Sequence, residues 1–210
     1  MSINLQKGQK IDLTKGSRGL SRIMVGLGWD EALPAYQQSG GGLFGLFKSQ
    51  PVPQSIDCDA SAIVLGTNGK LYRNDVESGC VYFHNLSLFG GAIQHQGDNL
   101  TGEGEGDDEQ IMVDLSRIPQ DVSKIVFVVN IYDANVKGQH FGMIQNAFIR
   151  LVNMANNSEI CKFDLSENYS GMTGMVVGEI YRYNGEWKFN AIGQPVKEAS
   201  RLGSLIRLYA

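Results

Sequence analysis

The dipeptide Asn184-Gly185 stands between two segments, 175–183 and 186–192, in which apolar and polar residues alternate. Asn and Gly accept the positive φ angles of a two-residue turn, so this arrangement is the strongest short-range signal for a β-hairpin. Residues 124–132 add a nearly unbroken apolar run, which is typical of a strand buried on both faces. These features predict a chain built from paired strands.

Turn residues recur at short intervals along the rest of the chain and separate further strand candidates. We expect these strands at 8–13, 23–29, 56–65, 69–73, 80–85, 110–115, 146–152 and 159–165. After Pro195, apolar residues recur at helical spacing, which predicts a short amphipathic helix at the C-terminus. About ten strands and one terminal helix predict an all-β fold, a two-sheet β-sandwich that forms a single domain over residues 1–210.

The composition limits the classes of protein to which the chain can belong. Its 210 residues are 42% hydrophobic and 19% charged, as in a globular domain, and the net charge of −4 argues against general nucleic-acid binding. The N-terminus lacks the apolar region of a signal peptide, and no apolar run reaches transmembrane length. The three cysteines are isolated and lack metal-site spacing, so we expect a reducing, cytoplasmic location.

Residues 34–54 interrupt the strand pattern, because glycine and proline are too dense there for regular structure. This Gly/Phe-rich insertion also contains four large apolar residues, Leu43, Phe44, Leu46 and Phe47, which a passive linker does not need. Their side chains either fold back onto the domain or form an exposed patch for a partner or a membrane surface. We expect them to fold back.

The most unusual stretch lies at residues 97–109, between two strand candidates. It holds six carboxylates, and no Lys or Arg occurs between Arg73 and Arg117. Such like charges repel one another unless a cation binds among them or water screens them. Closely spaced glycines let the backbone bend sharply, so that carboxylate and carbonyl oxygens can converge. Oxygen ligands suit a hard cation, and we expect Ca²⁺; a solvated acidic loop is the alternative.

The acidic stretch does not match the EF-hand, since Leu100 and Glu103 occupy positions where that motif needs an oxygen ligand and a glycine. Two more carboxylates, Asp57 and Asp59, point to one face of their strand, away from the apolar face. Asp30 ends the strand at 23–29 and is either a turn residue or a ligand. The candidate metal ligands are therefore Asp30, Asp57, Asp59, Asp98, Asn99, Gly102, Glu103, Gly104, Asp107, Asp108 and Glu109.

Several segments follow one another in a recognisable order within residues 1–195. Besides the acidic stretch they are residues 28–30, 57–61, 127–133, 141–142, 147–150, 178–182 and 185–189. In this order they resemble the TerD-like tellurium-resistance and stress-response proteins. The resemblance implies a calcium-binding β-sandwich in a bacterial cytoplasm, linked to resistance against tellurite, other toxic agents or phage. The usual chain of that family lacks the insertion at 34–54, and Leu is commoner than Cys at position 58.

On this basis we expect a non-enzymatic protein that binds about two Ca²⁺ ions and acts through Ca²⁺-dependent assembly or partner binding. Its partners would be other stress-response proteins of the same type or a second copy of itself. Direct chelation of a tellurium oxyanion is not expected, because acidic groups repel it and soft tellurium prefers clustered thiols. Two alternatives remain: a Ca²⁺-dependent ligand-binding module of lectin or lipid type, and a hydrolase that uses Asp57 and Asp59.

Overall fold

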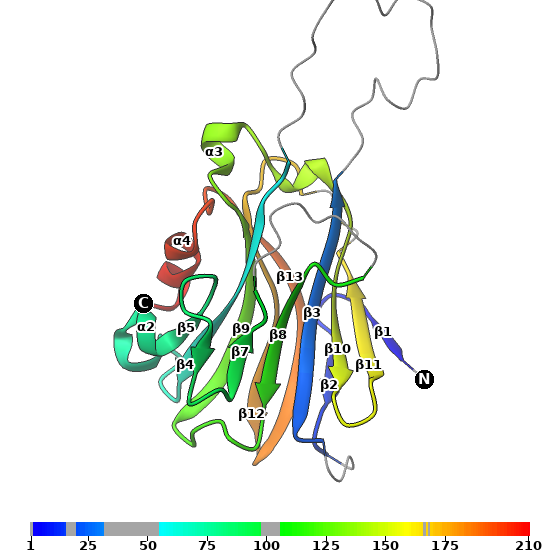
Figure 1. The fold of residues 1–210 in the computed structure, drawn as a ribbon, viewed down its shortest axis with the longest axis vertical. Helices are drawn as coiled ribbons and strands as arrows, with labels where there is room; N and C mark the ends of the chain where they lie inside the picture. Colours follow the sequence, from blue (N-terminus) through cyan, green and yellow to red (C-terminus); the bar gives the residue numbers. More distant parts are fainter. Residues whose placement is uncertain (1, 16–19, 32–54, 98–105, 166, 168) are drawn as a thin grey trace, which may run out of the picture.

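The structure is a computed structural model that describes residues 2–15, 20–31, 55–97, 106–165, 167 and 169–210. Two β-sheets pack face to face (Figure 1). In spatial order, sheet A contains β1 (Ile3–Leu5), β11 (Ser158–Asp164), β10 (Ile144–Asn153), β3 (Arg22–Glu31), β8 (Glu109–Asp114), β7 (Ile93–His95) and β6 (Ser87–Leu88). Sheet B contains β2 (Lys10–Asp12), β13 (Glu186–Val196), β12 (Gly174–Tyr183), β9 (Val122–Ile131), β4 (Cys58–Gly66) and β5 (Cys80–Val81). The predicted all-β sandwich is confirmed.

The strongest sequence signals correspond to the central strands. Asn184 and Gly185 have φ angles of 52° and 80° and join β12 to β13 in the predicted hairpin. β9 lies between β12 and β4 and is buried on both faces over most of its length, as its apolar run predicts. Inward side chains of β3, β4, β8 and β9 meet in the core between the sheets. The strands on either side of the acidic stretch are confirmed as β7 and β8.

Two predicted strands are wrong or too long. In place of a strand at 69–73, Leu71 makes a single bridge to Leu65 and the chain then enters a 3₁₀ helix, Tyr72–Asn74, and α2 (Val76–Gly79). The strand predicted at 80–85 stops at Val81, because Tyr82 and Asn85 exchange backbone hydrogen bonds and so close a turn. Alternation of apolar residues alone did not distinguish these tight turns from strands.

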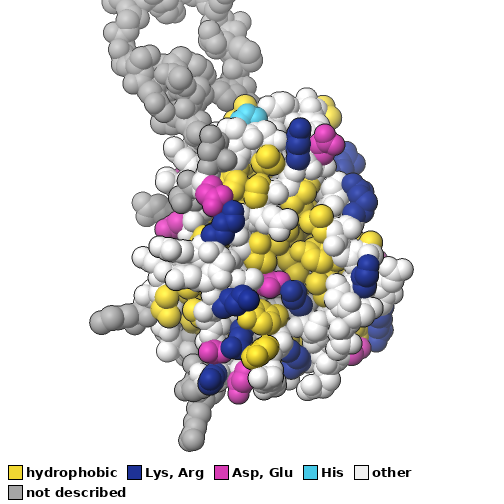
Figure 2. Space-filling model, turned by 180° about the vertical axis from the view of Figure 1, so that it is seen from behind, with side chains coloured by type: hydrophobic (Ala, Val, Ile, Leu, Met, Phe, Trp, Pro, Cys, Tyr) yellow, Lys and Arg dark blue, Asp and Glu magenta, His cyan; other side chains and the backbone are white. Residues whose placement is uncertain are grey.

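The C-terminal helix exists but is shorter than predicted. Pro195 and Val196 still pair with β12, so α4 covers only Leu202–Ile206 and is followed by a 3₁₀ helix, Arg207–Tyr209. Leu205 and Ile206 cover the outer face of sheet B, where they pack with apolar side chains of β4, β9 and β12. Seen from that side, hydrophobic side chains gather in the middle of the face and Lys and Arg lie around them (Figure 2).

Two further short helices, α3 (Ala134–Lys137) and a 3₁₀ helix at Phe141–Met143, lie at the end of the sandwich where β9 finishes (Figure 1). The insertion at 34–54, with Leu43, Phe44, Leu46 and Phe47, lies outside the described residues, and so the expected fold-back stays a prediction. Within the described ranges, no helix is long and apolar enough to cross a membrane.

Candidate metal centre

The end of the acidic stretch packs against two glycines of β3, on the outer face of sheet A. A Cβ atom at Gly26 would lie 2.3 Å from the Asp107 Cγ, and one at Gly28 would lie 2.6 Å from the Gly106 carbonyl oxygen. The Asp108 N–H donates to the Leu27 carbonyl at 2.8 Å. The alternation of large inward residues with outward glycines in β3 therefore leaves room for residues 106–108 to lie directly on the strand.

Asp107 is held on this outer face by Arg150 of β10. The Arg150 Nε and Nη2 atoms donate to its two carboxylate oxygens at 2.7 and 2.9 Å, and the Asp107 side chain is fully buried. The hydrogen bonds that Arg150 donates to Asp107 raise the pKa of Arg150. Arg150 lies 43 residues from Asp107 along the chain, so the sequence around the acidic stretch gives no sign of this cationic partner. The charge of Asp107 is thus balanced by the protein itself.

Glu109 points the opposite way, into the sandwich. Its Oε2 accepts from the Ala60 N–H at 2.5 Å, and the His95 Nε2 lies 3.2 Å from the Ala60 carbonyl oxygen and 3.5 Å from Glu109 Oε2. Within β4, β5 pairs with Ala62 and Ile63 and does not extend to Ala60. The edge of β4 at Ala60 is therefore not covered by β5. The two buried side chains connect this edge to β7 and β8. His95 is not among the metal ligands that the sequence predicts; from the sequence it is expected to be a hydrogen-bonding or surface histidine.

Asp59 lies on the outer face of sheet B, opposite Asn130 of β9. The Asn130 Nδ2 donates to Asp59 Oδ2 at 3.0 Å. The Asn130 Oδ1 is buried and accepts no hydrogen bond from the described residues. An amide oxygen is a ligand that Ca²⁺ uses in proteins. Sequence analysis missed Asn130, although a single polar residue within an apolar strand was a usable signal.

Asp108 and Asp30 occupy the end of β3. The Trp29 N–H donates to Asp108 Oδ2 at 2.7 Å, and the Asn146 Nδ2 donates to Asp30 Oδ2 at 2.7 Å. Burial raises the pKa of Asp108, and the nearby charges of Asp30 and Asp107 raise it further, against the opposing effect of the Trp29 N–H. A raised carboxylate pKa means that the negative charge is unfavourable there and that a bound cation would relieve it.

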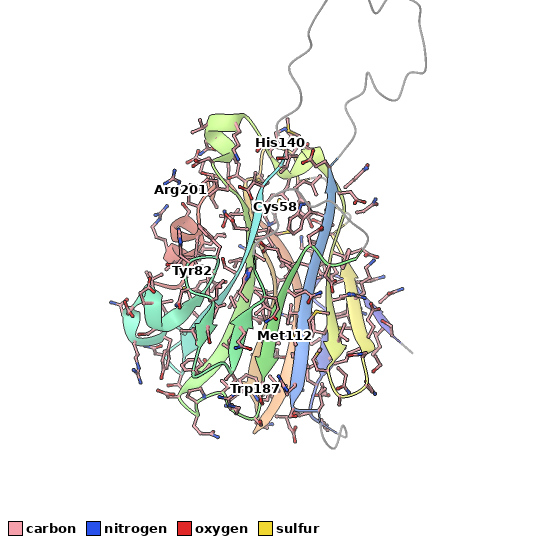
Figure 3. The ribbon with its side chains drawn as sticks, in the orientation of Figure 1. Cys58, Tyr82, Met112, His140, Trp187 and Arg201 are labelled. Atoms are coloured by element: carbon pink, nitrogen blue, oxygen red, sulfur yellow. The ribbon has the colours of Figure 1, made fainter. Side chains whose placement is uncertain are left out.

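The thiol of Cys58, which Figure 3 labels, is buried, and several of the predicted ligands influence its pKa. Burial raises its pKa most, followed in order by the charges of Glu109, Asp59, Asp57 and Asp108. Four candidate ligands from two separate segments therefore act electrostatically on one buried point. A cation near these carboxylates would offset their mutual repulsion, and carboxylate oxygens are the type of ligand that hard ions such as Ca²⁺ prefer.

The other predicted ligands, Asp98, Asn99, Gly102, Glu103 and Gly104, lie outside the described residues. Within the described part of the chain, no three His, Cys, Asp or Glu side chains are close enough to hold an ion. The described residues alone therefore do not form a complete coordination shell.

Known proteins place the whole chain in one family. The TerD domain matches residues 1–209. The chain is 50% identical over 209 residues to stress response protein SCP2 of Bacillus subtilis, with both chains fully covered. It is 44% identical over 194 residues to tellurium resistance protein TerD of Serratia marcescens, covering 92% of this chain and 91% of that one.

A solved structure supports the fold independently. The crystal structure of a homologue of telluride resistance protein (TerD) from Streptomyces coelicolor A3(2) superposes with a TM-score of 0.60 at 20% identity, covering 86% of this chain and 92% of the other. Since the family match extends over nearly all 210 residues, the chain belongs to the TerD domain family.

Proposed function

We propose that this protein is a non-enzymatic Ca²⁺-binding stress-response protein that acts through Ca²⁺-dependent assembly. The observation that supports the proposal is that the charges of Asp57, Asp59, Asp108 and Glu109, which come from two separate segments, all raise the pKa of the buried Cys58 thiol. Asn130 adds an amide oxygen beside Asp59. The sequence supplies Asp98, Asn99 and Glu103, with the carbonyls of Gly102 and Gly104, as the remaining donors.

The proposed donor set omits Asp107, because both of its carboxylate oxygens already bind Arg150. Asp30 stays in the set as a peripheral charge, since it acts on Asp108 and is itself exposed. The donors come from β4 and the residue before it, from β9, and from β8 and the segment before it, so a bound ion would connect the two sheets. Such an ion would stabilise the folded chain by mass action, because the unfolded chain does not preserve this arrangement.

An aromatic and cationic surface next to Asp57 supports the assembly part of the proposal. The Tyr132 N–H donates to the Asp57 carbonyl at 2.8 Å. The Tyr132 ring has Lys137 Nζ at 5.6 Å and the Arg201 guanidinium at 5.7 Å, and the Phe83 ring packs against it at 6.5 Å. We propose that Ca²⁺ orders this surface for a second copy of the chain or a related stress-response protein, in a reducing cytoplasm where the three cysteines stay as thiols.

Thermal unfolding of the metal-stripped chain tests the proposal. We expect Ca²⁺ at about 1 mM to raise the melting temperature and Asp59→Asn to reduce that rise strongly. Asp164→Asn is the matched control: it makes the same change on an exposed carboxylate of β11 and should leave the rise intact. The readout is the shift caused by Ca²⁺ within each variant, so a change in basal stability does not affect it.

Size-exclusion chromatography with light scattering, run with and without Ca²⁺, tests assembly separately. We expect a larger species only when Ca²⁺ is present and Asp59 is intact. A melting temperature that responds equally to Ca²⁺ in the wild type and Asp59→Asn would contradict the assigned site. A constant particle mass would contradict self-assembly and leave a related stress-response protein as the proposed partner, to be tested by mixing the two purified proteins.

A further inference from the structure

Three methionines line one groove on the outer face of sheet A. The groove has a volume of about 320 Å³ and extends over β8, β3 and β10. Its apolar lining consists of Met24, Met112, Val152 and Met154, and its polar lining consists of Gln96, Gln110, Arg150, Asn157 and Glu159. Among the described residues, none of the proposed Ca²⁺ donors lines this groove.

The strand register brings the methionines together. Met24 lies directly opposite Met112 in the β3–β8 pair and directly opposite Val152 in the β3–β10 pair. Directly opposed residues of antiparallel strands have Cβ atoms about 4.5–5.5 Å apart, within reach of two flexible Met side chains. The Met154 N–H donates to the Arg22 carbonyl at 3.1 Å, which fixes Met154 beside the start of β3. Figure 3 labels Met112 on the sheet that faces the viewer.

The chemistry of this lining differs from that of the acidic stretch. A thioether sulfur is a soft, uncharged donor, which binds soft cations such as Cu(I) and is a poor ligand for Ca²⁺ and Mg²⁺. The positive charge in the lining is already paired with carboxylates, so it should not prevent a cation from binding in the groove. Arg150 is the cationic side chain of the lining, and it is engaged by Asp107 at 2.7 Å and by Glu159 at 3.4 Å.

We propose that Met24, Met112 and Met154 form a thioether site for a soft monovalent cation, Cu(I), on the outer face of sheet A. The site goes beyond the proposed Ca²⁺ function, since it uses sulfur donors in place of oxygen donors and would select a soft cation. Ag(I) has the same charge and softness without the redox chemistry of copper, and so it is the probe for the experiment.

The cysteines do not offer a competing sulfur site while the chain is folded. Cys58, Cys80 and Cys161 are all buried. Burial raises the pKa of Cys80 and of Cys161 to about 12, so the metal-binding thiolate is scarce at neutral pH. Ag(I) added to the folded chain should therefore meet the methionine groove first, through the half-buried Met112 and Met154 beside the buried Met24.

The test is a titration of the full-length chain with Ag(I) in chloride-free buffer, followed by calorimetry and native mass spectrometry. We expect the wild type to bind one Ag(I) and the double variant Met24→Leu, Met112→Leu to bind it at least about tenfold more weakly. Leu replaces Met at nearly constant volume, so the fold should be kept, and circular dichroism verifies this. Met143→Leu is the control, because this exposed methionine lies on the 3₁₀ helix at Phe141–Met143, away from the groove.

X-ray absorption at the silver edge, combined with a count of reactive thiols, identifies the ligands. Thioether coordination with all three thiols still unreactive is the expected result. Equal affinity of the wild type and the double variant would overturn the proposal. Thiolate coordination, or a wild type that binds no Ag(I), would overturn it as well.

Discussion

Arg150 clamps Asp107 against the outer face of sheet A, with Nε and Nη2 donating to the two carboxylate oxygens at 2.7 and 2.9 Å. This pair fixes the exit of the acidic stretch without a metal ion. Asp107 faces outward at this point, whereas Glu109, two residues later, faces the interior and bonds to the Ala60 N–H. The same short segment therefore anchors to its own sheet and reaches the opposite one.

Arg150→Ala should destabilise the chain in the absence of metal. The variant leaves the buried Asp107 carboxylate without its counter-charge, and we expect a cost of about 1.5–3 kcal/mol. Urea unfolding measures it. Arg150→Lys should recover only part of the loss, since Lys keeps the charge but not the two-pronged geometry. Lys162→Ala, which removes a surface ion pair with Asp164, should change stability by less than about 0.5 kcal/mol; equal losses for Arg150→Ala and Lys162→Ala would refute the clamp.

Gly28→Ala should displace the end of the acidic stretch. The new Cβ atom would lie 2.5 Å from the Phe148 ring and 2.6 Å from the Gly106 carbonyl oxygen, and backbone cannot move aside easily. We expect a loss of about 1–3 kcal/mol from overpacking, together with weaker Ca²⁺ binding. Gly203→Ala in α4 is the control, because its Cβ meets nothing within 4 Å and Ala favours the helix. Wild-type stability in Gly28→Ala would mean that residues 106–108 do not lie on β3.

Tyr209 should make stability sensitive to alkaline pH. Burial, assisted by the charge of Glu179, raises the pKa of Tyr209 from 10.0 to about 12. Because the unfolded chain ionises this hydroxyl first, the associated stability is fully present below pH 10 and is lost as the pH rises towards 12. Tyr209→Phe keeps the ring and removes the ionisation, so its unfolding midpoint should fall less over this range. Cys80 and Cys161 titrate in the same window, and so the difference between wild type and variant is the measurement; parallel curves would contradict it.

The proposed site should prefer Ca²⁺ to Mg²⁺. Carboxylates and carbonyls on a glycine-rich segment provide many ligands in irregular geometry, which suits Ca²⁺, whereas Mg²⁺ requires a tight octahedron and retains its waters. In competition titrations, Mg²⁺ at equal concentration should leave most of the Ca²⁺ bound. Complete displacement by Mg²⁺ would show that the coordination shell is small and regular, contrary to the proposed set of donors.

The parts of the fold that were predictable depend on local patterns. The Asn184-Gly185 turn needs only the backbone freedom of two residues, and the apolar run of β9 needs only burial on both faces. The helix predicted after Pro195 was too long, because strand pairing with β12 keeps Pro195 and Val196 in β13. A helical spacing of apolar residues does not report such a tertiary contact.

The sequence predicts the carboxylates of the candidate site, and this assignment stays a prediction, whereas their hydrogen-bond and ion-pair partners follow only from the fold. Asp57, Asp59, Asp108 and Glu109 were identified from charge and alternation, and their common effect on Cys58 agrees with a shared location. Asn130 reaches Asp59, His95 reaches Glu109 and Arg150 reaches Asp107 through pairing between distant strands, and no local spacing encodes that register. The sequence therefore indicates which side chains carry negative charge, whereas only the fold shows which side chains bind to them.

Calorimetric titration of Ca²⁺ into the metal-stripped, full-length chain tests the central claim most directly. The account predicts a saturable heat of binding, about two Ca²⁺ ions per chain, and a marked loss of that heat in Asp59→Asn but not in Asp164→Asn. No heat at millimolar Ca²⁺, or identical isotherms for the wild type and Asp59→Asn, would contradict it.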